Sequence, residues 1–153
     1  MNSLTKLILS AAALSLMATA AQAQTFTFQS TQTKAVATGS TAPDGTPFGG
    51  LFQTGTQVIT MAGGKQVSET FTCIGSTQPP RDAVFQFSTV CDSTGPSGDA
   101  SSVWGCNFLN RERTEVACVG GIYGRSGSYA VKRGTVTWHG VNGSGSGTGQ
   151  WNN

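Results

Sequence analysis

The sequence predicts an all-β fold, an antiparallel meander of about eight strands closed as a barrel, with a β-sandwich as the alternative. Three observations predict it. Charged residues make up 10% of the chain, which contains 21 glycines, and Ser and Thr fill most of the polar positions. Such a composition is typical of strands joined by tight turns. After residue 23, no segment shows the 3.6-residue apolar period of an amphipathic helix. A closed barrel is favoured because closure removes exposed strand edges from a weakly charged surface.

Strand-like stretches and turn clusters alternate along the chain. Phe26 and Phe28 alternate with polar residues in the first stretch, and the run Ala62-Gly63-Gly64 is typical of a hairpin turn, because glycine readily adopts positive φ. Loops are expected at 39–47, around Pro79-Pro80 and at 92–100. The expected strands are 25–30 with a continuation over 34–38, 48–61, 66–74, 83–91, 103–108, 114–119, 128–138 and 147–151.

The first 23 residues have the three parts of a secretory signal peptide. Lys6 supplies positive charge, an apolar run extends from Leu7 to Ala21, and Ala21-Gln22-Ala23 is the small-x-small pattern cut by signal peptidase. The mature chain would then be one domain over residues 24–153. The apolar run is about fifteen residues, shorter than the roughly 20 that span a bilayer, and no stop-transfer segment follows. We therefore expect a periplasmic or secreted protein with no membrane insertion after cleavage.

The four cysteines predict two disulfides, because an even number in an exported chain reads as a disulfide framework with three pairings open. A hairpin reversing around Glu112 would pair Phe108 with Val116 and place Cys106 opposite Cys118. Cys73 then pairs with Cys91 by elimination. No two cysteines have the C-x2-C spacing typical of a metal site, so neither a metal nor another cofactor is predicted.

The most distinctive stretch is Gly120-Gly121-Ile122-Tyr123-Gly124-Arg125-Ser126-Gly127-Ser128-Tyr129, followed by the strand-like segment 133–138 and the glycine-rich run 145–151. A glycine-rich segment with an aromatic residue, then another glycine turn into a strand, resembles the signature of dirigent and allene oxide cyclase-like barrels. One residue here separates the glycine pair from Tyr123, so the motif is incomplete. The resemblance covers the last third of the chain. It implies an eight-stranded barrel with a mainly apolar cavity, trimeric assembly, and relatives that steer cyclisation or radical coupling. No catalytic residue of that family maps onto this chain. Glycines in strands also mark bulges and close backbone approach, which explains the same run structurally.

Glu69 is the first candidate for proton transfer. In a straight strand it shares a face with Val67, Phe71 and Cys73, while the opposite face is mostly polar. An inward carboxyl in an apolar barrel would be a plausible proton donor or acceptor. A bulge in this strand would instead place Glu69 in water.

His139 is the second candidate, because it is the only histidine and would serve any histidine-dependent catalysis. It is expected at a strand end, where it could face the barrel mouth or be an ordinary turn residue. No G-x-S-x-G elbow supplies a partnered nucleophile. The candidate ligand-binding residues are two core aromatics, one aromatic of the glycine-rich stretch and one arginine between turn glycines: Trp104, Trp138, Tyr123 and Arg125.

Three functions follow as hypotheses. The first is an exported barrel that binds a small, largely apolar ligand in its interior. The second is a cyclase or isomerase of the allene oxide cyclase and dirigent type. The third is an envelope structural or interaction protein with a filled barrel. Nucleic-acid binding is not expected, because lysines and arginines cluster only at Arg111/Arg113 and Lys132-Arg133. Homo-oligomerisation is expected only through the family resemblance, which favours a trimer.

Overall fold

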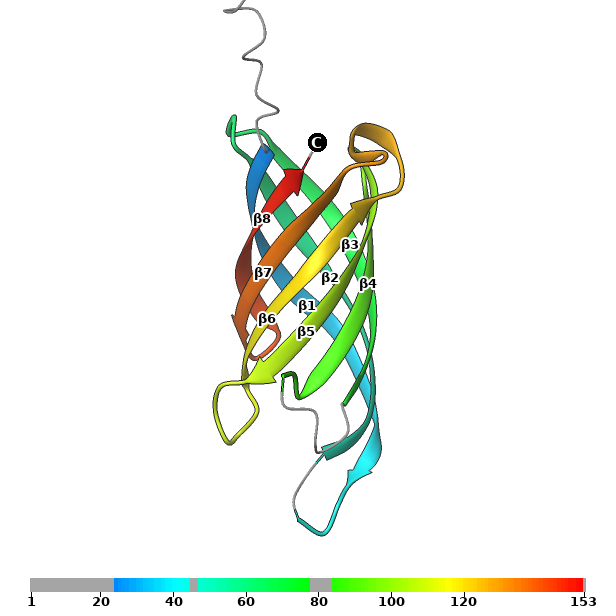
Figure 1. The fold of residues 1–153 in the computed structure, drawn as a ribbon, viewed down its shortest axis with the longest axis vertical. Coiled ribbons are helices and arrows are strands. Elements are labelled where there is room, and N and C mark those ends of the chain that lie inside the picture. Colours follow the sequence, from blue (N-terminus) through cyan, green and yellow to red (C-terminus); the bar gives the residue numbers. More distant parts are fainter. Residues whose placement is uncertain (1–23, 45–46, 78–83, 153) are drawn as a thin grey trace, which may run out of the picture.

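The structure, a computed structural model, describes residues 24–44, 47–77 and 84–152. The proposed signal peptide and the Pro79-Pro80 loop lie outside the described residues. The strands close into one barrel and are tilted relative to its axis (Figure 1). The strands are β1 (Gln24–Thr41), β2 (Pro47–Met61), β3 (Gln66–Thr77), β4 (Phe87–Gly95), β5 (Gly98–Phe108), β6 (Glu115–Gly124), β7 (Arg133–Val141) and β8 (Ser144–Asn152), with a short 3-10 helix η1 (Gly127–Tyr129) between β6 and β7.

The strands form a meander in which each pairs antiparallel with the next, and β1 pairs with β8 to close the barrel. The closing register joins Gln24 to Trp151 and Thr31 to Ser144. The predicted all-β fold with a closed antiparallel barrel is therefore confirmed. Alternate residues of each strand face inward and outward, and this periodicity sets what lines the interior.

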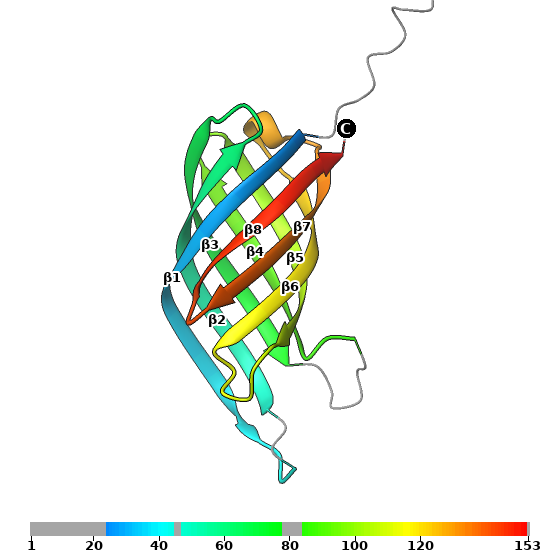
Figure 2. The same cartoon turned by 90° about the vertical axis from the view of Figure 1, so that its left-hand side faces the viewer.

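The two ends of the barrel differ. One end carries both termini of the domain and the connection that contains η1; the other carries a long β1–β2 ribbon that extends past the remaining strands (Figure 2). A register shift between Gln32 and Lys34 separates the part of β1 that pairs with β8 from this extension. The buried core lies toward the η1 end and consists of Phe26, Phe28, Ile59, Ala100, Tyr129, Val136 and Trp151.

Turn chemistry accounts for two of the connections. Asn142 and Gly143 both have positive φ, 50° and 80°, which is the conformation of the tight turn that joins strands of native twist. Gly64 has a φ of 80° in the β2–β3 turn, within the glycine-rich run expected to reverse the chain.

Some predicted element bounds were wrong. The segment expected as a loop at 92–100 is mostly strand, because β4 continues to Gly95 and β5 begins at Gly98. The segment expected as one strand over 128–138 begins with η1, and β7 starts only at Arg133. In both places the chain turns within a few residues, and polar composition alone misplaced the turn.

Candidate functional site: an apolar cavity inside the barrel

The barrel encloses a cavity of about 760 Å³. Residues that line it at the η1 end, such as Phe26 and Tyr129, are buried. At the other end the lining includes Phe48, which is 66% exposed. The cavity is therefore closed at the η1 end and open toward the β1–β2 ribbon. Its volume falls within the range of small-molecule sites.

Glycines on the inner wall make room for this cavity. A Cβ atom at Gly147 would collide with the ring of Phe28, one at Gly149 with the ring of Phe26, and one at Gly55 with the ring of Phe71. Each ring thus lies flat across a glycine of a neighbouring strand. Because the rings lie against the wall, they contribute apolar surface without filling the centre of the barrel.

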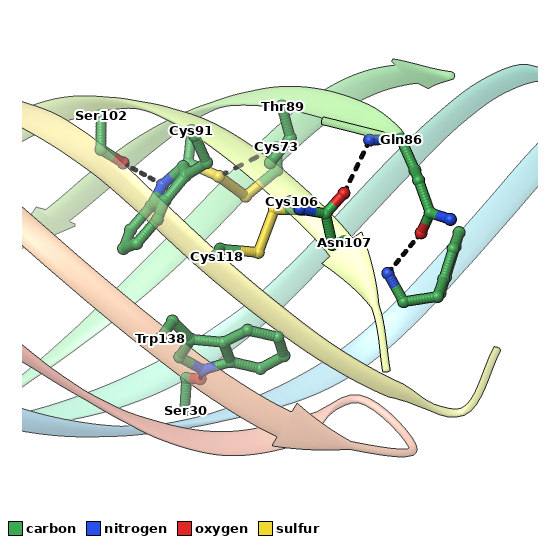
Figure 3. Close-up of a disulfide and its surroundings, with 12 residues drawn as sticks. Ser30, Cys73, Gln86, Thr89, Cys91, Ser102, Cys106, Asn107, Cys118 and Trp138 are labelled. Carbon is green, nitrogen blue, oxygen red and sulfur yellow. Dashed lines mark hydrogen bonds between the residues drawn. A yellow bond between two sulfur atoms is a disulfide. The ribbon is translucent and has the colours of Figure 1, made fainter. Parts of the chain in front are cut away.

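Two tryptophans present their indole rings to the cavity with their N–H groups already bonded. Trp104 Nε1 donates to Ser102 Oγ at 2.7 Å, and Trp138 Nε1 donates to Ser30 Oγ at 2.9 Å. Both tryptophans line the cavity, and Figure 3 shows the pairing of Trp138 with Ser30. With its donor satisfied by the protein, each indole offers an apolar face to an occupant.

Both disulfides also lie on the inner wall (Figure 3). Cys73 bonds to Cys91 across β3 and β4, and Cys106 bonds to Cys118 across β5 and β6. Phe108 pairs with Val116, so the predicted hairpin register and both predicted bridges are confirmed. All four cysteines are used, and the bridges add apolar lining to the cavity.

The closed end of the cavity holds a buried carboxyl group. Glu69 is 4% exposed and lines the cavity. The Tyr129 hydroxyl donates to Glu69 Oε1 at 2.9 Å, and Gln57 Nε2 donates to Glu69 Oε2 at 3.0 Å. Each carboxyl oxygen therefore has one protein donor, which offsets the cost of removing the group from water.

Burial of the Tyr129 hydroxyl, and next its hydrogen bond to Glu69, raise the pKa of Tyr129 well above its ordinary value. The phenol therefore stays protonated and remains a donor to the carboxyl throughout the neutral range. Its ring stacks on Trp151 with the centroids 5.4 Å apart, which closes this end of the barrel with aromatic surface.

The β6–β7 connection holds Tyr129 in place through the β4–β5 turn. Ser126 Oγ contacts both the backbone N–H and the carboxyl of Asp99, each at 2.9 Å, and the Ser128 backbone N–H donates to the Ser97 carbonyl at 2.7 Å. Gly127 has a φ of 60° and packs so closely against Ser97 that no Cβ would fit. In this way the glycine-rich stretch places the Tyr129 ring where it closes the η1 end of the barrel.

The open end is lined by small residues and by a pair of phenylalanines. Ala35 and Ala37 face the cavity from the β1–β2 ribbon. Phe87 and Phe108 lie with their ring centroids 5.0 Å apart, and the Arg113 guanidinium lies 5.8 Å from the Phe108 ring. Polar side chains such as Gln53, Thr77 and Thr114 also line the cavity, so access to it is past a mixed apolar and polar surface with the Arg113 cation at its edge.

Three of the residues singled out from the sequence lie on the outside. The His139 side chain is 56% exposed and its Nε2 lies 2.8 Å from Glu115 Oε1. Arg125 forms an exposed ion pair with Asp92 at 3.6 Å, and Tyr123 lies under the Arg133 guanidinium at 5.7 Å. None of the three lines the cavity. The structure thus brings Glu69, Trp104 and Trp138 to one cavity and separates them from His139, Tyr123 and Arg125.

Sequence reasoning missed Tyr129 and Gln57 as partners of Glu69. Tyr129 was placed in a strand, whereas it belongs to η1 and reaches a residue 60 positions away in the chain. The signal that could have found it is the pair Gly124 and Gly127, which flank a short connection rather than a strand interior. Gln57 sits directly opposite Glu69 in the β2–β3 register, which becomes visible only once that pairing is known.

Among the described residues, no group of three or more His, Cys, Asp or Glu side chains is placed to hold a metal ion. In the same part of the chain, no helix is long and apolar enough to cross a membrane. Two disulfides are typical of proteins that work in oxidising compartments outside the cytosol. No protein-family model matches the chain, and no curated protein matches it, so its fold and cavity are the guides to its function.

Proposed function

We propose that this chain is an exported barrel that binds one small, largely apolar molecule in its interior, in the periplasm or outside the cell. The observation that carries the proposal is the cavity of about 760 Å³, open at one end. A filled structural barrel would not retain such a space. The lining surface is mainly apolar, with aromatic rings, disulfides and small aliphatic groups, and polar side chains are interspersed among them.

The groups that orient the ligand sit at the closed end. Glu69 and Tyr129 form a hydrogen-bonded pair there, and the tryptophan faces lie between this pair and the open mouth. A ligand with one hydroxyl or carbonyl group could exchange hydrogen bonds with the pair while its apolar body contacts Trp104 and Trp138. The polar end of the ligand is therefore expected to point inward.

The first test is native mass spectrometry of the mature protein purified from its own source. A small molecule that is retained in the native spectrum and released on denaturation supports the proposal and names the chemical class of the ligand. A protein that is empty, and that also fails to bind the neutral apolar dye N-phenyl-1-naphthylamine, contradicts it.

A matched pair of variants locates the binding site. Ser93 lines the cavity, whereas Thr94, the next residue of β4, is exposed and does not. Ser93→Phe should weaken dye binding several-fold because its ring occupies the cavity, and Thr94→Phe should leave binding unchanged. Energy transfer from tryptophan to the dye measures both. Equal effects of the two substitutions would place the dye on the outer surface.

A second candidate function is a cyclase or isomerase that transfers a proton, as the family resemblance implies. The observation favouring it is a single carboxyl group at the closed end of an apolar cavity, in reach of an occupant. Glu69→Gln keeps the shape and the acceptor oxygen but removes the ionisable group. If the retained molecule is converted to product by the native protein, this variant should bind it and fail to turn it over. Turnover unchanged in the variant would dismiss Glu69 as the catalytic residue.

A further inference from the structure

One hydrogen-bonded row on the outside of the barrel is apolar across five consecutive strands. The residues pair directly with one another from β1 to β5, and they are between 39% and 67% exposed. None of them lines the cavity. We name this set the outer apolar row: Val36, Phe52, Ile74, Val90 and Val103.

The neighbouring rows on the same strands lack large apolar residues. Two positions to one side, the paired residues are Lys34, Thr54, Thr72, Asp92 and Ser101, and two positions to the other side they are Thr38, Gly50, Ser76, Ser88 and Gly105. Beyond Val103 the same row continues as Gly121, Thr135 and Gln150. A single exposed apolar residue is ordinary, but five in register form a contiguous patch on one side of the barrel.

We propose that the outer apolar row is where two copies of this chain associate, about a two-fold axis that passes beside Ile74. A two-fold interface places the same patch of each copy against the other, so the patch must be complementary to itself when reversed. Ile74 is the middle residue of the five and the most exposed, at 67%. Reversal about it sets Ile74 on the partner's Ile74 and Phe52 on the partner's Val90, so that apolar groups meet at every central position.

The charge around the row favours a second copy over a charged partner. On β1 to β5 the ionisable residues of the two flanking rows are Lys34, which pairs with Thr54, and Asp92, which is paired with Arg125 at 3.6 Å and accepts from Ser101 at 2.6 Å. Two copies therefore meet without like charges opposed, while a strongly acidic or basic partner finds no complement.

The size of the patch predicts a weak dimer. Four inter-strand spacings of about 4.8 Å make the row about 19 Å long, and the flanking rows extend it by about 7 Å to each side. The resulting strip is on the order of 300 Å² per copy, below the roughly 800 Å² per partner of a stable interface. The barrel surface is also convex, so Phe52, Ile74 and Val90 form the centre of the contact. We expect a weak dimer that forms only at high protein concentration.

Sedimentation velocity over a broad concentration series tests the proposal. The mature protein should pass from monomer to dimer as its concentration rises. Ile74→Lys places two like charges at the axis and should weaken the dimer at least tenfold, as a rough estimate from the cost of opposed charges. Thr135→Lys adds the same charge to the polar part of the same row and should leave the dimer intact. Because both sites are exposed, neither change should alter the fold or dye binding in the cavity.

A pair of substitutions that introduces opposite charges tests the position of the two-fold axis. Phe52→Lys and Val90→Glu should each weaken the dimer, and the double variant should restore it, because each new lysine then faces a new glutamate across the axis.

A wild-type protein that stays monomeric at all concentrations overturns the proposal. If that monomer instead sediments with phosphatidylcholine vesicles and Ile74→Lys does not, the row binds lipid. Dimers unaffected by Ile74→Lys form elsewhere and also overturn it.

Discussion

The Tyr129 hydroxyl is buried against a carboxyl group, and both conditions favour its protonated form. The pKa of this group is thus higher in the folded chain than in the unfolded chain, where it is about 10. Its contribution to stability is fully present below pH of about 10 and is lost as the pH rises through the raised folded pKa. The free energy of unfolding therefore decreases as the pH rises above about 10.

This predicts an alkaline fall in the free energy of unfolding that depends on one residue. Urea unfolding measured from about pH 8 to about pH 11 should show stability decreasing above the ordinary tyrosine pKa. Tyr129→Phe should be less stable at neutral pH by about 1–3 kcal/mol, because Glu69 loses a donor while remaining buried. It should also show a smaller alkaline decrease. Tyr123→Phe removes the other tyrosine, which is 44% exposed, and should change neither quantity. Parallel pH profiles for the wild type and Tyr129→Phe would contradict the prediction.

At the scale of strands, the aromatic rings and the glycines beneath them act as pairs. Gly147→Ala should destabilise the barrel by about 1–3 kcal/mol, because the added methyl collides with the Phe28 ring and the Thr137 carbonyl. The displaced ring should also reduce dye binding. Gly121→Ala is the matched control, since the nearest atom to its Cβ is the Gly134 carbonyl oxygen at 3.9 Å. Urea unfolding and dye titration measure both variants, and equal stability of the two would refute the pairing.

The disulfides join neighbouring strands of two hairpins, and the bonded cysteines are 18 and 12 positions apart in the sequence. Replacing either pair with alanines should lower the free energy of unfolding by about 3 kcal/mol, mainly because the unfolded chain gains freedom. The two losses should be similar, since the cost depends only weakly on loop length. The register is held by the backbone ladder as well, so each variant should keep its β-sheet circular dichroism. Loss of the folded signal in either variant would show that the bridge is required for closure.

For the whole molecule, the sequence was informative where the deciding contacts are local. The Cys106–Cys118 bridge followed from a short hairpin, because a register can be counted outward from one turn. The alternation around Glu69 pointed to its face for the same reason. The Glu69–Tyr129 bond and the outer apolar row could not be found in this way. The Glu69–Tyr129 bond depends on how the β6–β7 connection folds against the β4–β5 turn. The outer apolar row depends on the registers of four successive strand pairs.

The pairing of β1 with β8 has a consequence for how the chain reaches this state. Gln24 and Trp151 are neighbours in the closing ladder, so closure of the barrel joins the two ends of the domain. A chain that emerges from the N-terminal end first must keep β1 without one of its two partners until β8 has arrived. Contacts of such long sequence separation slow folding and leave strand edges exposed in the interval. The period between synthesis and closure is therefore when this protein is most vulnerable to aggregation and proteolysis.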